Sequence, residues 1–417
     1  MHGFRRWRGA VGTGLVSVLA AWLLSGCAAP AWPSTAISRS AVASVASPIA
    51  GLRLLGSATL SRTPDGVLQH FGGISGMDRD PTSGDWLMLS DDKSELAPAR
   101  FYTLRLRIDA QGIGPIEPLA VTLLRQPDGT PYPGPAQARA RPGAVVPDPE
   151  ALRIDPRDGS LLYTSEGDRG LGLDPFVRRM GRDGRFVREL TLPARLHLQR
   201  DPPRGPRHNL SLEGLAFTPD AQALWVAMEA PLIEDGPPPD AQHGALVRFS
   251  LLGRDDALLT QLAYPVDAIP RAATGGGRRA DNGVSEILAI DRDRLLVVER
   301  CGYEVDAMVF RFAIRLYEAE VAGAQDVSAI DSLLQPRVRP LRKRLLLDLS
   351  TLQGAGLGPI DNIEAAAWGP RLPNGHATLL LASDDNFSPG QRNQFIALEV
   401  IPANLAEPTN PAFSAHP

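Results

Sequence analysis

The sequence predicts an all-β protein built as a β-propeller of four-stranded antiparallel blades. Short apolar runs alternate with clusters of Gly, Pro, Asn and Asp along the body of the chain, and helical periodicity is nearly absent. One hairpin pattern also recurs five times in order. Because each hairpin is followed by further strand-like runs, the repeat has the make-up of a propeller blade.

Each repeat begins with two apolar arms joined by turn-forming residues such as Pro156-Arg157-Asp158-Gly159. The five copies cover residues 73–92, 149–166, 212–229, 285–300 and 363–385. An acidic residue stands near the end of both arms in most copies, as Glu213 and Glu229 do in the third. Residues equally far from a hairpin turn face each other across the strand pair. We therefore expect the two acids of each hairpin to lie side by side at its open end.

The remaining strands decide how the ring closes. Further strand-like runs cover residues 100–108, 176–180, 186–190, 245–251, 258–264, 309–317, 344–349 and 395–401. The last repeat lacks a fourth strand, whereas Leu52 to Leu60 is a spare strand at the start, so we expect this strand to complete the last blade. Five blades carry the motif; a sixth without it could lie in 125–146 or in the partly helical-looking 318–343, and a pair of β-sandwiches is the rival architecture.

The N-terminal segment has the features of an export signal. Arg5, Arg6 and Arg8 precede an uncharged, mostly apolar run, and Leu24-Ser25-Gly26-Cys27 follows. This pattern resembles a bacterial lipobox, which implies lipidation of Cys27; the alternative is an ordinary signal peptide with an incidental cysteine. We therefore expect a signal peptide at 1–26, a flexible tether at 27–50, a propeller domain at 51–402 and a C-terminal tail at 403–417.

The expected location follows from that signal. A lipidated Cys27 would anchor an exported protein to the bacterial envelope, on the periplasmic side of the outer membrane in a Gram-negative cell, with the anchor as its only membrane contact. Only Cys301 remains in the rest of the chain, so no internal disulfide is expected. The formal net charge of −4 argues against nucleic acid as a partner. We expect a monomer.

The repeated acids are the candidate functional residues. Since the first strand of a blade lines the central channel, the acids of the first arms should surround one channel mouth as candidate catalytic residues: Glu150, Glu213, Glu286 and Glu364. The acids that end the second arms should stand behind them as candidate metal ligands: Asp91, Glu166, Glu229, Glu299 and Asp384. The candidate substrate-binding residues are Arg169, Arg300, Arg392 and Asn386.

So many neighbouring carboxylates cannot all remain ionised unless a cation or arginine compensates them. An all-oxygen set without cysteine or histidine suits a divalent cation, with Ca²⁺ expected and Mg²⁺ the alternative. The competing interpretation is that each glutamate caps a turn or pairs with an arginine between blades, or that the ring holds a structural ion.

The motifs also match a known pattern. The segments concerned are Gly72-Gly73-Ile74-Ser75-Gly76 with Ser90-Asp91-Asp92, Leu212-Glu213-Gly214-Leu215-Ala216, Ser285-Glu286-Ile287-Leu288 with Glu299-Arg300, and Asn362-Ile363-Glu364 with Ser383-Asp384-Asp385-Asn386-Phe387 and Gln391. In this order they resemble the phytase-like family, described as "esterase-like activity of phytase", from about residue 51 to 400. The resemblance implies a β-propeller whose recurring Glu and Asp residues form the active centre. Ala151 and Ala365 depart from the glycine that the family usually has after Glu.

The expected function is an envelope-anchored, phytase-like or esterase-like hydrolase of small phosphoesters. A divalent cation and arginine would bind the phosphoester, and a carboxylate would activate water. Two alternatives stay open: a non-catalytic propeller that binds a ligand or protein and has a structural Ca²⁺ site, and a lactonase-like hydrolase. Ser75 is a poor candidate nucleophile because its segment lacks the second glycine of a nucleophile elbow.

Overall fold

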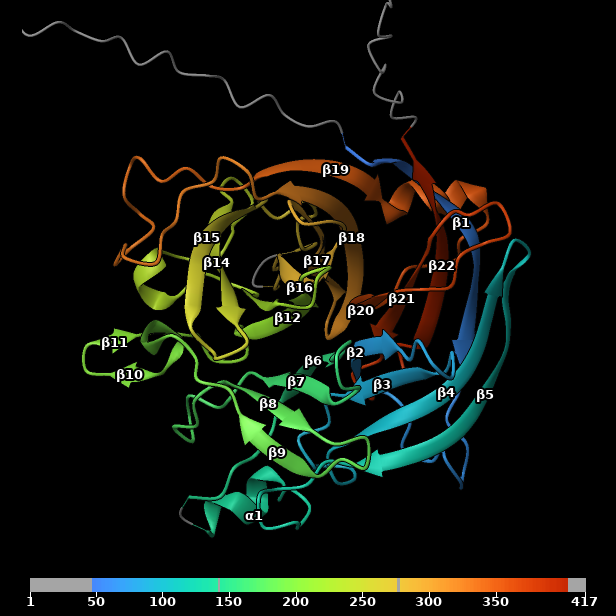
Figure 1. Ribbon diagram of the computed structural model, residues 1–417, viewed down its shortest axis with the longest axis horizontal. Coiled ribbons are helices and arrows are strands. Elements are labelled where there is room, and N and C mark those ends of the chain that lie inside the picture. Colours follow the sequence, from blue (N-terminus) through green and yellow to red (C-terminus); the bar gives the residue numbers. More distant parts are fainter. Residues whose placement is uncertain (1–46, 142, 276–277, 404–417) are drawn as a thin grey trace, which may run out of the picture. The chain divides into compact units, whose positions relative to one another are not determined.

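The computed structural model describes residues 47–141, 143–275 and 278–403. Five four-stranded antiparallel sheets stand around a central axis as the blades of a β-propeller (Figure 1). The innermost strands of the blades contact one another in a closed cycle. They are β2 (Ile74–Arg79), β6 (Pro149–Ile154), β12 (Leu212–Phe217), β16 (Gly283–Ala289) and β20 (Asn362–Trp368). The predicted fold class is confirmed, and the blades in the described part of the chain number five.

Each blade takes its strands in sequence order from the axis outward, except the fifth. Blade 1 continues with β3 (Trp86–Ser90), β4 (Arg100–Asp109) and β5 (Gly112–Leu123), and blade 2 with β7 (Leu161–Ser165), β8 (Phe176–Met180) and β9 (Phe186–Glu189). Blade 3 continues with β13 (Ala223–Met228), β14 (Ala245–Gly253) and β15 (Leu258–Val266), and blade 4 with β17 (Arg294–Asp306), β18 (Val309–Glu320) and β19 (Arg342–Asp348). Blade 5 continues with β21 (Thr378–Asp384), β22 (Asn393–Pro402) and β1 (Ile49–Leu60).

The N-terminal strand closes the ring, as predicted. β1 pairs antiparallel with β22, with Leu52 opposite Val400 and Leu54 opposite Leu398, so blade 5 contains the first and last described strands of the chain (Figure 1). Pairing the two ends in one sheet ties the circle of blades shut and occupies a strand edge that would otherwise be exposed.

Small elements fill the connections. They are α1 (Pro135–Arg139), the two-stranded ribbon β10 (Gln199–Arg200) and β11 (Pro203–Arg204), and three 3₁₀ turns at Ala194–Leu196, Ile233–Asp235 and Leu349–Ala355. The described residues of 125–146 are loop with α1, and 321–341 is turn and coil, so neither segment forms a blade there and the expected helix in the second is wrong. Among the described residues, none of the helices is both long and apolar enough to cross a membrane. The expected signal peptide, Cys27 and nearly all of the expected tether and tail lie outside the described ranges.

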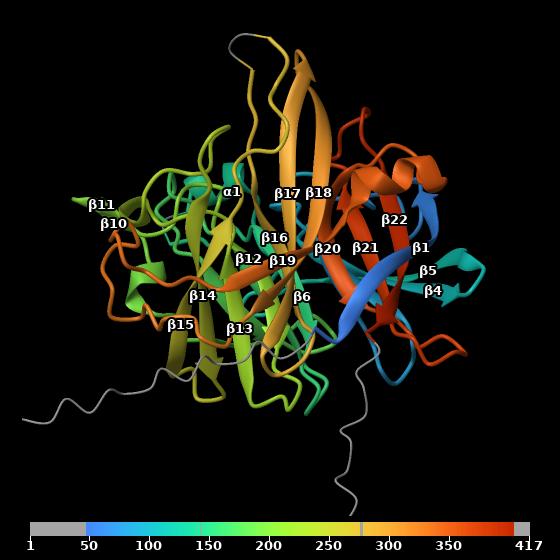
Figure 2. The same cartoon turned by 90° about the horizontal axis from the view of Figure 1, so that it is seen from above.

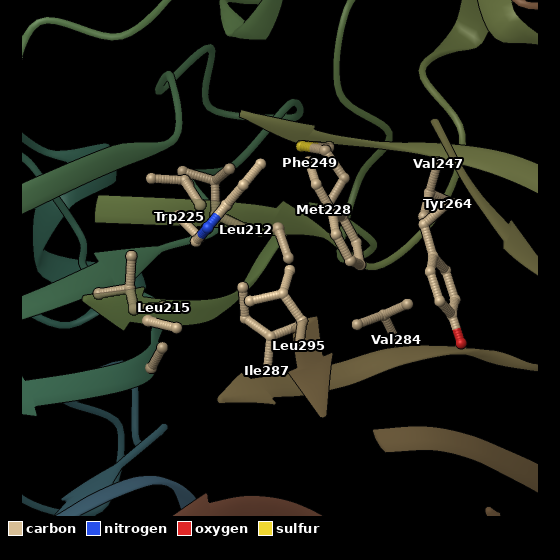
Figure 3. Packing of buried hydrophobic residues seen from close by; sticks show 14 of the residues in the cluster. Leu212, Leu215, Trp225, Met228, Val247, Phe249, Tyr264, Val284, Ile287 and Leu295 are labelled. Carbon is tan, nitrogen blue, oxygen red and sulfur yellow. The ribbon is translucent and has the colours of Figure 1, made fainter. Parts of the chain in front are cut away.

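Both faces of the inner strands of a blade are buried against its neighbours, which explains why these strands are nearly continuously apolar. Between blades 3 and 4, Trp225 and Phe249 approach Val284 and Ile287 from opposite sheets (Figure 3). All six residues of β13 are buried. Burial of these apolar side chains between neighbouring blades stabilises each blade interface through the hydrophobic effect.

A β-bulge recurs at the same place in every blade and aims side chains at one end of the channel. The register between the first two strands shifts by one residue near the start of the inner strand in all five blades. The residues at the shift are Ser75, Glu150 with Ala151, Glu213, Ser285 and Glu364. A bulge inserts one unpaired residue and redirects its side chain. It therefore positions the candidate site.

The residue after the bulge is small where inner strands approach closely. A Cβ atom on Gly76 would lie 2.4 Å from the carbonyl oxygen of Glu150, and one on Gly214 would lie 2.9 Å from Ile287. Backbone at 2.4 Å cannot yield to a side chain, so Gly76 is required by packing. In the Glu-Gly and Glu-Ala pairs of the motif, the glutamate thus lies at the bulge, and the small residue after it allows close contact with the next blade.

Candidate metal centre at one mouth of the channel

Carboxyl groups from four blades converge where the inner hairpins end. We call this group the acidic mouth; it consists of Asp91, Asp148, Glu150, Glu166, Glu213, Glu229, Glu364 and Asp384. Each of these residues interacts electrostatically with at least one other member, and Glu213 does so with Glu166, Glu229 and Glu364. The expectation that paired acids of several hairpins gather at one end therefore holds for the acids of blades 1, 2, 3 and 5.

Blade 4 differs from the prediction. Its register places Glu286 opposite Val298, and Glu299 opposite Val284, so these two acids do not face each other. The bulge of this blade lies at Ser285, one residue before Glu286, and the strand-end position that is acidic in the other blades is Arg300. A shift of one residue moves a side chain to another direction. Glu286 and Glu299 consequently lie outside the acidic mouth.

Each of these two glutamates has its own structural partners. Glu286 forms an ion pair with Arg153 at 2.7 Å and accepts a hydrogen bond from the backbone N–H of Ile287 at 2.8 Å. Glu299 accepts a hydrogen bond from the hydroxyl of Tyr264 at 2.8 Å and pairs with Lys343. Both acids pin neighbouring strands, as the competing interpretation of the motif expected.

Two groups of three carboxylates have the spacing of a cation site. In the first, Asp148, Glu150 and Glu166 each offer one oxygen, and these oxygens lie within 4.8 Å of one another. Glu166, Glu213 and Glu229 form the second group under the same criterion. Glu166 belongs to both, and its Oε1 also accepts a hydrogen bond from the backbone N–H of Ser211. The two groups thus lie side by side, with one carboxylate in common.

Burial and mutual repulsion dominate the electrostatics. Burial raises the pKa values of Glu150, Glu166 and Glu213 well above the usual carboxyl value, and repulsion from neighbouring carboxylates raises them further. Burial raises the pKa of Glu229 to about 8 although Arg300 opposes this shift. Without added positive charge, several of these groups would hold a proton near neutral pH. A bound cation would relieve the same repulsion.

Two cationic side chains reach into the acidic mouth. The Lys93 ammonium lies 2.5 Å from Asp148. Burial alone would lower the pKa of Lys93, but the charge and hydrogen bond of Asp148, together with the charges of Glu150 and Glu166, raise it to about 12. Arg300 contacts Glu229 at 2.8 Å and Glu364 at 3.6 Å, and its side chain is 16% exposed. These two cations are fewer than the carboxyl groups, so ionisation of all the carboxyl groups would leave the mouth with an excess of negative charge.

Hydrogen bonds hold the blade 5 side of the mouth. The amide Nδ2 of Asn362 donates to Oε1 of Glu364 at 2.9 Å and to Oδ2 of Asp384 at 3.1 Å, while the Ser75 hydroxyl donates to Oε2 of Glu364 at 3.2 Å. In contrast, Oδ1 of Asp91 is buried and has no hydrogen-bond partner among the described residues. Glu364 is therefore held in place, whereas Asp91 has a free acceptor.

Of the predicted substrate-binding residues, the structure brings only Arg300 into this group. Arg169 donates to the carbonyl oxygens of Arg204 at 2.6 Å and Pro206 at 2.8 Å, so it stabilises a loop. Arg392 lies 3.5 Å from Asp361 with 44% of its side chain exposed. The side chain of Asn386 is exposed, and its backbone N–H donates to Asp384 at 2.6 Å.

Asp148 and Lys93 were missed by the sequence prediction. Asp148 stands two residues before Glu150, just ahead of β6, and Lys93 stands two residues after Asp91, just beyond the end of β3. Lys93 is also one of only two lysines in the chain, and both lysines pair with buried acids. The rarity of lysine was therefore the signal in the sequence that could have identified Lys93.

The donor set fits a hard divalent cation. All ligand atoms in the two groups are carboxylate oxygens, and Glu150 and Glu213 donate or accept no side-chain hydrogen bond within the described chain. Carboxylate oxygens with free lone pairs are the ligands of Ca²⁺ and Mg²⁺, and zinc sites are instead rich in histidine and cysteine. The residues present can therefore hold such an ion.

Comparison with known proteins agrees with the fold. A model of the phytase-like family, described as esterase-like activity of phytase, matches residues 69–387. No curated protein matched the chain. The family match covers every inner hairpin from the first blade to the fifth.

Among solved structures, the similarities are remote. The Pseudomonas aeruginosa periplasmic gluconolactonase PpgL is 13% identical, with coverage of 85% of this chain and 97% of that one, at a TM-score of 0.32. An α-L-arabinanase from Penicillium chrysogenum is 12% identical, with coverage of 81% and 85% at a TM-score of 0.37. The Dos1 propeller is 5% identical, with coverage of 78% of this chain and 66% of that one at a TM-score of 0.31.

Proposed function

The chain belongs to the phytase-like family, and starting from this membership we propose that it is a hydrolase of phosphoesters that depends on a divalent cation. The observation that carries the proposal is the pair of carboxylate groups that share Glu166, with Arg300 beside them. A strongly anionic mouth does not bind a phosphate by itself. Together with a cation, it becomes a site that does.

The protein residues have distinct roles in this proposal. A divalent cation bound by Asp148, Glu150 and Glu166, or by Glu166, Glu213 and Glu229, would supply charge neutralisation and polarisation of a phosphoryl oxygen. Arg300 orients the phosphate through its guanidinium, which already lies between Glu229 and Glu364. Glu364 is the carboxyl group placed to accept or release a proton, because hydrogen bonds from Asn362 and Ser75 orient it.

Hydrolysis of a panel of esters tests the proposal. The purified protein would be treated with chelator and assayed with p-nitrophenyl phosphate, bis-p-nitrophenyl phosphate, p-nitrophenyl acetate and a lactone, with and without added Ca²⁺ or Mg²⁺. We expect cation-dependent cleavage of a phosphoester. Glu213→Gln should lower the activity at subsaturating cation by on the order of 10–100-fold, whereas Glu117→Gln, at an exposed side chain, should not change it.

The alternatives predict different results. A non-catalytic propeller with a structural Ca²⁺ would show a cation-dependent melting temperature and no turnover of any ester, and this outcome would contradict the proposal. Cleavage of the lactone alone would favour the lactonase-like alternative. Because Glu286 and Glu299 form structural ion pairs, the non-catalytic alternative needs this direct test.

We also propose that the protein is exported and anchored through Cys27. The support is the lipobox-like segment Leu24-Ser25-Gly26-Cys27 behind a basic and then apolar stretch. Metabolic labelling with a fatty acid in a bacterial host tests it: the parent should incorporate label into the membrane fraction, and Cys27→Ala should not. Label in the variant, or none in the parent, would contradict the anchor.

A further inference from the structure

A cavity lies at the end of the propeller axis opposite the acidic mouth, where the turns of the inner hairpins meet. Its volume is about 660 Å³, and every blade contributes to its lining through residues at or after the end of its inner strand. Cavities of this size are typical of small-molecule sites. It is formed by β2, β6, β12, β16 and β20 at the end opposite the bulges, so it is distinct from the acidic mouth.

The Arg153–Glu286 pair separates the two sites. Arg153 is 4% exposed and lines this cavity, and Glu286 is fully buried. Their ion pair and the hydrogen bonds of Arg153 to the carbonyl oxygens of Met77 and Ile287 fill the axis between the two ends. A ligand in the cavity therefore need not affect the acidic mouth.

The wall of the cavity is mostly apolar. It includes three prolines from successive hairpin turns and three large side chains from the inner strands: Pro81, Pro156, Pro219, Phe217, Leu288 and Trp368. The indole N–H of Trp368 donates to the carbonyl oxygen of Ala289 at 2.9 Å, so the ring is fixed with its polar atom satisfied. Such a wall favours a ligand with an apolar body.

One side of the cavity carries an excess of positive charge. Arg79 of blade 1 and Arg371 of blade 5 line it from adjacent blades, and neither forms an ion pair within the described chain. His376 lies beside them with its Nδ1 bonded to Glu399 at 2.7 Å. The remaining acid, Asp78, accepts hydrogen bonds from the backbone N–H groups of Arg79 and Ile154, at 2.8 and 2.9 Å, so its oxygens are already used.

We propose that this cavity binds a small amphipathic anion, with its apolar body against Phe217, Leu288 and Trp368 and its acidic head at Arg79 and Arg371. The apolar wall supplies most of the binding free energy by excluding water. The two guanidinium groups, which have no acidic partner among the described residues although Arg371 donates to the carbonyl oxygen of Gly375 at 2.8 Å, select a negative head group. Free carboxylates, sulfonates and phosphate monoesters on a short apolar chain belong to this class.

Probe binding to the purified full-length protein tests the proposal. 1-Anilinonaphthalene-8-sulfonate should bind saturably at one site per chain, and octanoate should displace it and change the fluorescence of the protein, whereas 1-octanol at equal concentration should displace it at least about tenfold less well. The double variant Arg79→Gln with Arg371→Gln should weaken octanoate binding by about tenfold or more. Arg292→Gln, an exposed arginine of the blade 4 turn outside the lining, is the matched control.

A filling variant keeps the test independent of charge. Ala289→Phe places a ring in the cavity and should abolish saturable binding, and Ala377→Phe is the second variant if the first does not reach the melting temperature of the parent. Non-saturable binding, equal affinity for octanol, or unchanged affinity in a folded filling variant would overturn the proposal. Glu213→Gln should leave probe binding unchanged, so a failure here is distinguishable from a failure of the proposed hydrolase.

Discussion

Nη2 of Arg153 lies 2.7 Å from Oε2 of Glu286, and this pair touches all five inner strands of the propeller. Its hydrogen bonds reach backbone groups of Met77, Leu152, Leu215, Ile287 and Ala366. These residues belong to β2, β6, β12, β16 and β20. The chain thus places a buried charge pair at the point where its blades meet, where a purely apolar plug would leave strand carbonyls without donors.

Breaking this pair should destabilise the whole ring. Arg153→Met would leave Glu286 buried without its counter-charge and several carbonyl groups without a donor, so we expect a loss of about 3–5 kcal/mol in the free energy of unfolding. Urea unfolding followed by tryptophan fluorescence measures it. The double variant with Glu286→Leu should lose less than the sum of the single variants.

Arg105→Met is the matched control, because Arg105 is 59% exposed and pairs with the exposed Glu117. We expect that variant to lose no more than about 1 kcal/mol. An Arg153 variant as stable as the control would refute the central role of the pair.

The stability of the metal-free protein should fall as the pH rises. Burial raises the pKa of Glu229 to about 8 in the folded state and the pKa values of Glu150 and Glu213 well above their usual value, whereas an unfolded glutamate titrates near about 4.3. A carboxyl group whose pKa is raised by folding stabilises the protein below its unfolded pKa, and this stabilisation is lost as the pH rises through the folded pKa. We expect the melting temperature of chelator-treated protein to fall between about pH 5 and pH 8.

Calcium should reverse this trend. Because a cation binds the ionised carboxylates of the acidic mouth, the gain in melting temperature on adding Ca²⁺ should be larger at pH 8 than at pH 5. Scanning calorimetry at both pH values provides the comparison. A metal-free melting temperature that rises from pH 5 to pH 8 would contradict the buried carboxyl groups as described.

Substitution of Gly73 should destabilise the protein through backbone strain and through a clash with Asp91. Gly66 is a control in which only the backbone strain is present. The φ of Gly73 is +62°, and a Cβ atom would lie 2.0 Å from Oδ1 of Asp91 and 2.7 Å from the ring of Phe387. Gly66 also has a positive φ, +76°, with no atom within 4 Å of its Cβ position. Gly66→Ala should therefore cost only the backbone strain of about 1–2 kcal/mol.

Gly73→Ala adds displacement of Asp91 to that strain, so it should cost clearly more stability and change the affinity for Ca²⁺. Chemical unfolding and calorimetric titration of the two variants measure the difference. Equal effects of the two substitutions would show that Asp91 can move at no cost.

Arg300 and Arg392 should differ in their effect on binding. Arg300→Gln removes a positive charge that contacts Glu229 and Glu364, so we expect tighter cation binding in the absence of substrate. If the protein hydrolyses phosphoesters as proposed, the same variant should raise KM about tenfold by removing a phosphate contact.

Arg392→Gln changes an exposed rim residue that contacts Asp361, and both quantities should stay within about twofold of the parent. Calorimetric Ca²⁺ titration and steady-state kinetics supply the two measurements. Weaker cation binding by the Arg300 variant would mean that this arginine organises the carboxylates and does not compete with the ion.

The fold was predictable because its signals are local. The hairpin repeat, the turn residues and the spare strand at Leu52–Leu60 are read directly from the chain, and all three appear in the structure. The register of a hairpin, which depends on where a bulge lies, could not be found by counting residues along the sequence. In blade 4, Glu286 and Glu299 are centred on the hairpin turn as the paired acids of the other blades are, yet a bulge at Ser285 gave both residues other neighbours.

The type of site was therefore predictable from the sequence, but only some of its residues were. Alternation and turn chemistry allow the sequence alone to determine that hairpin ends gather acids at one mouth of a propeller, because they depend on neighbours along the chain. Tertiary structure alone decided that Arg300 replaces an acid there, that Lys93 and Asp148 join, and that Arg153 closes the axis. These choices depend on a one-residue register and on which blades meet across the channel, and both are set by packing between segments far apart in the chain.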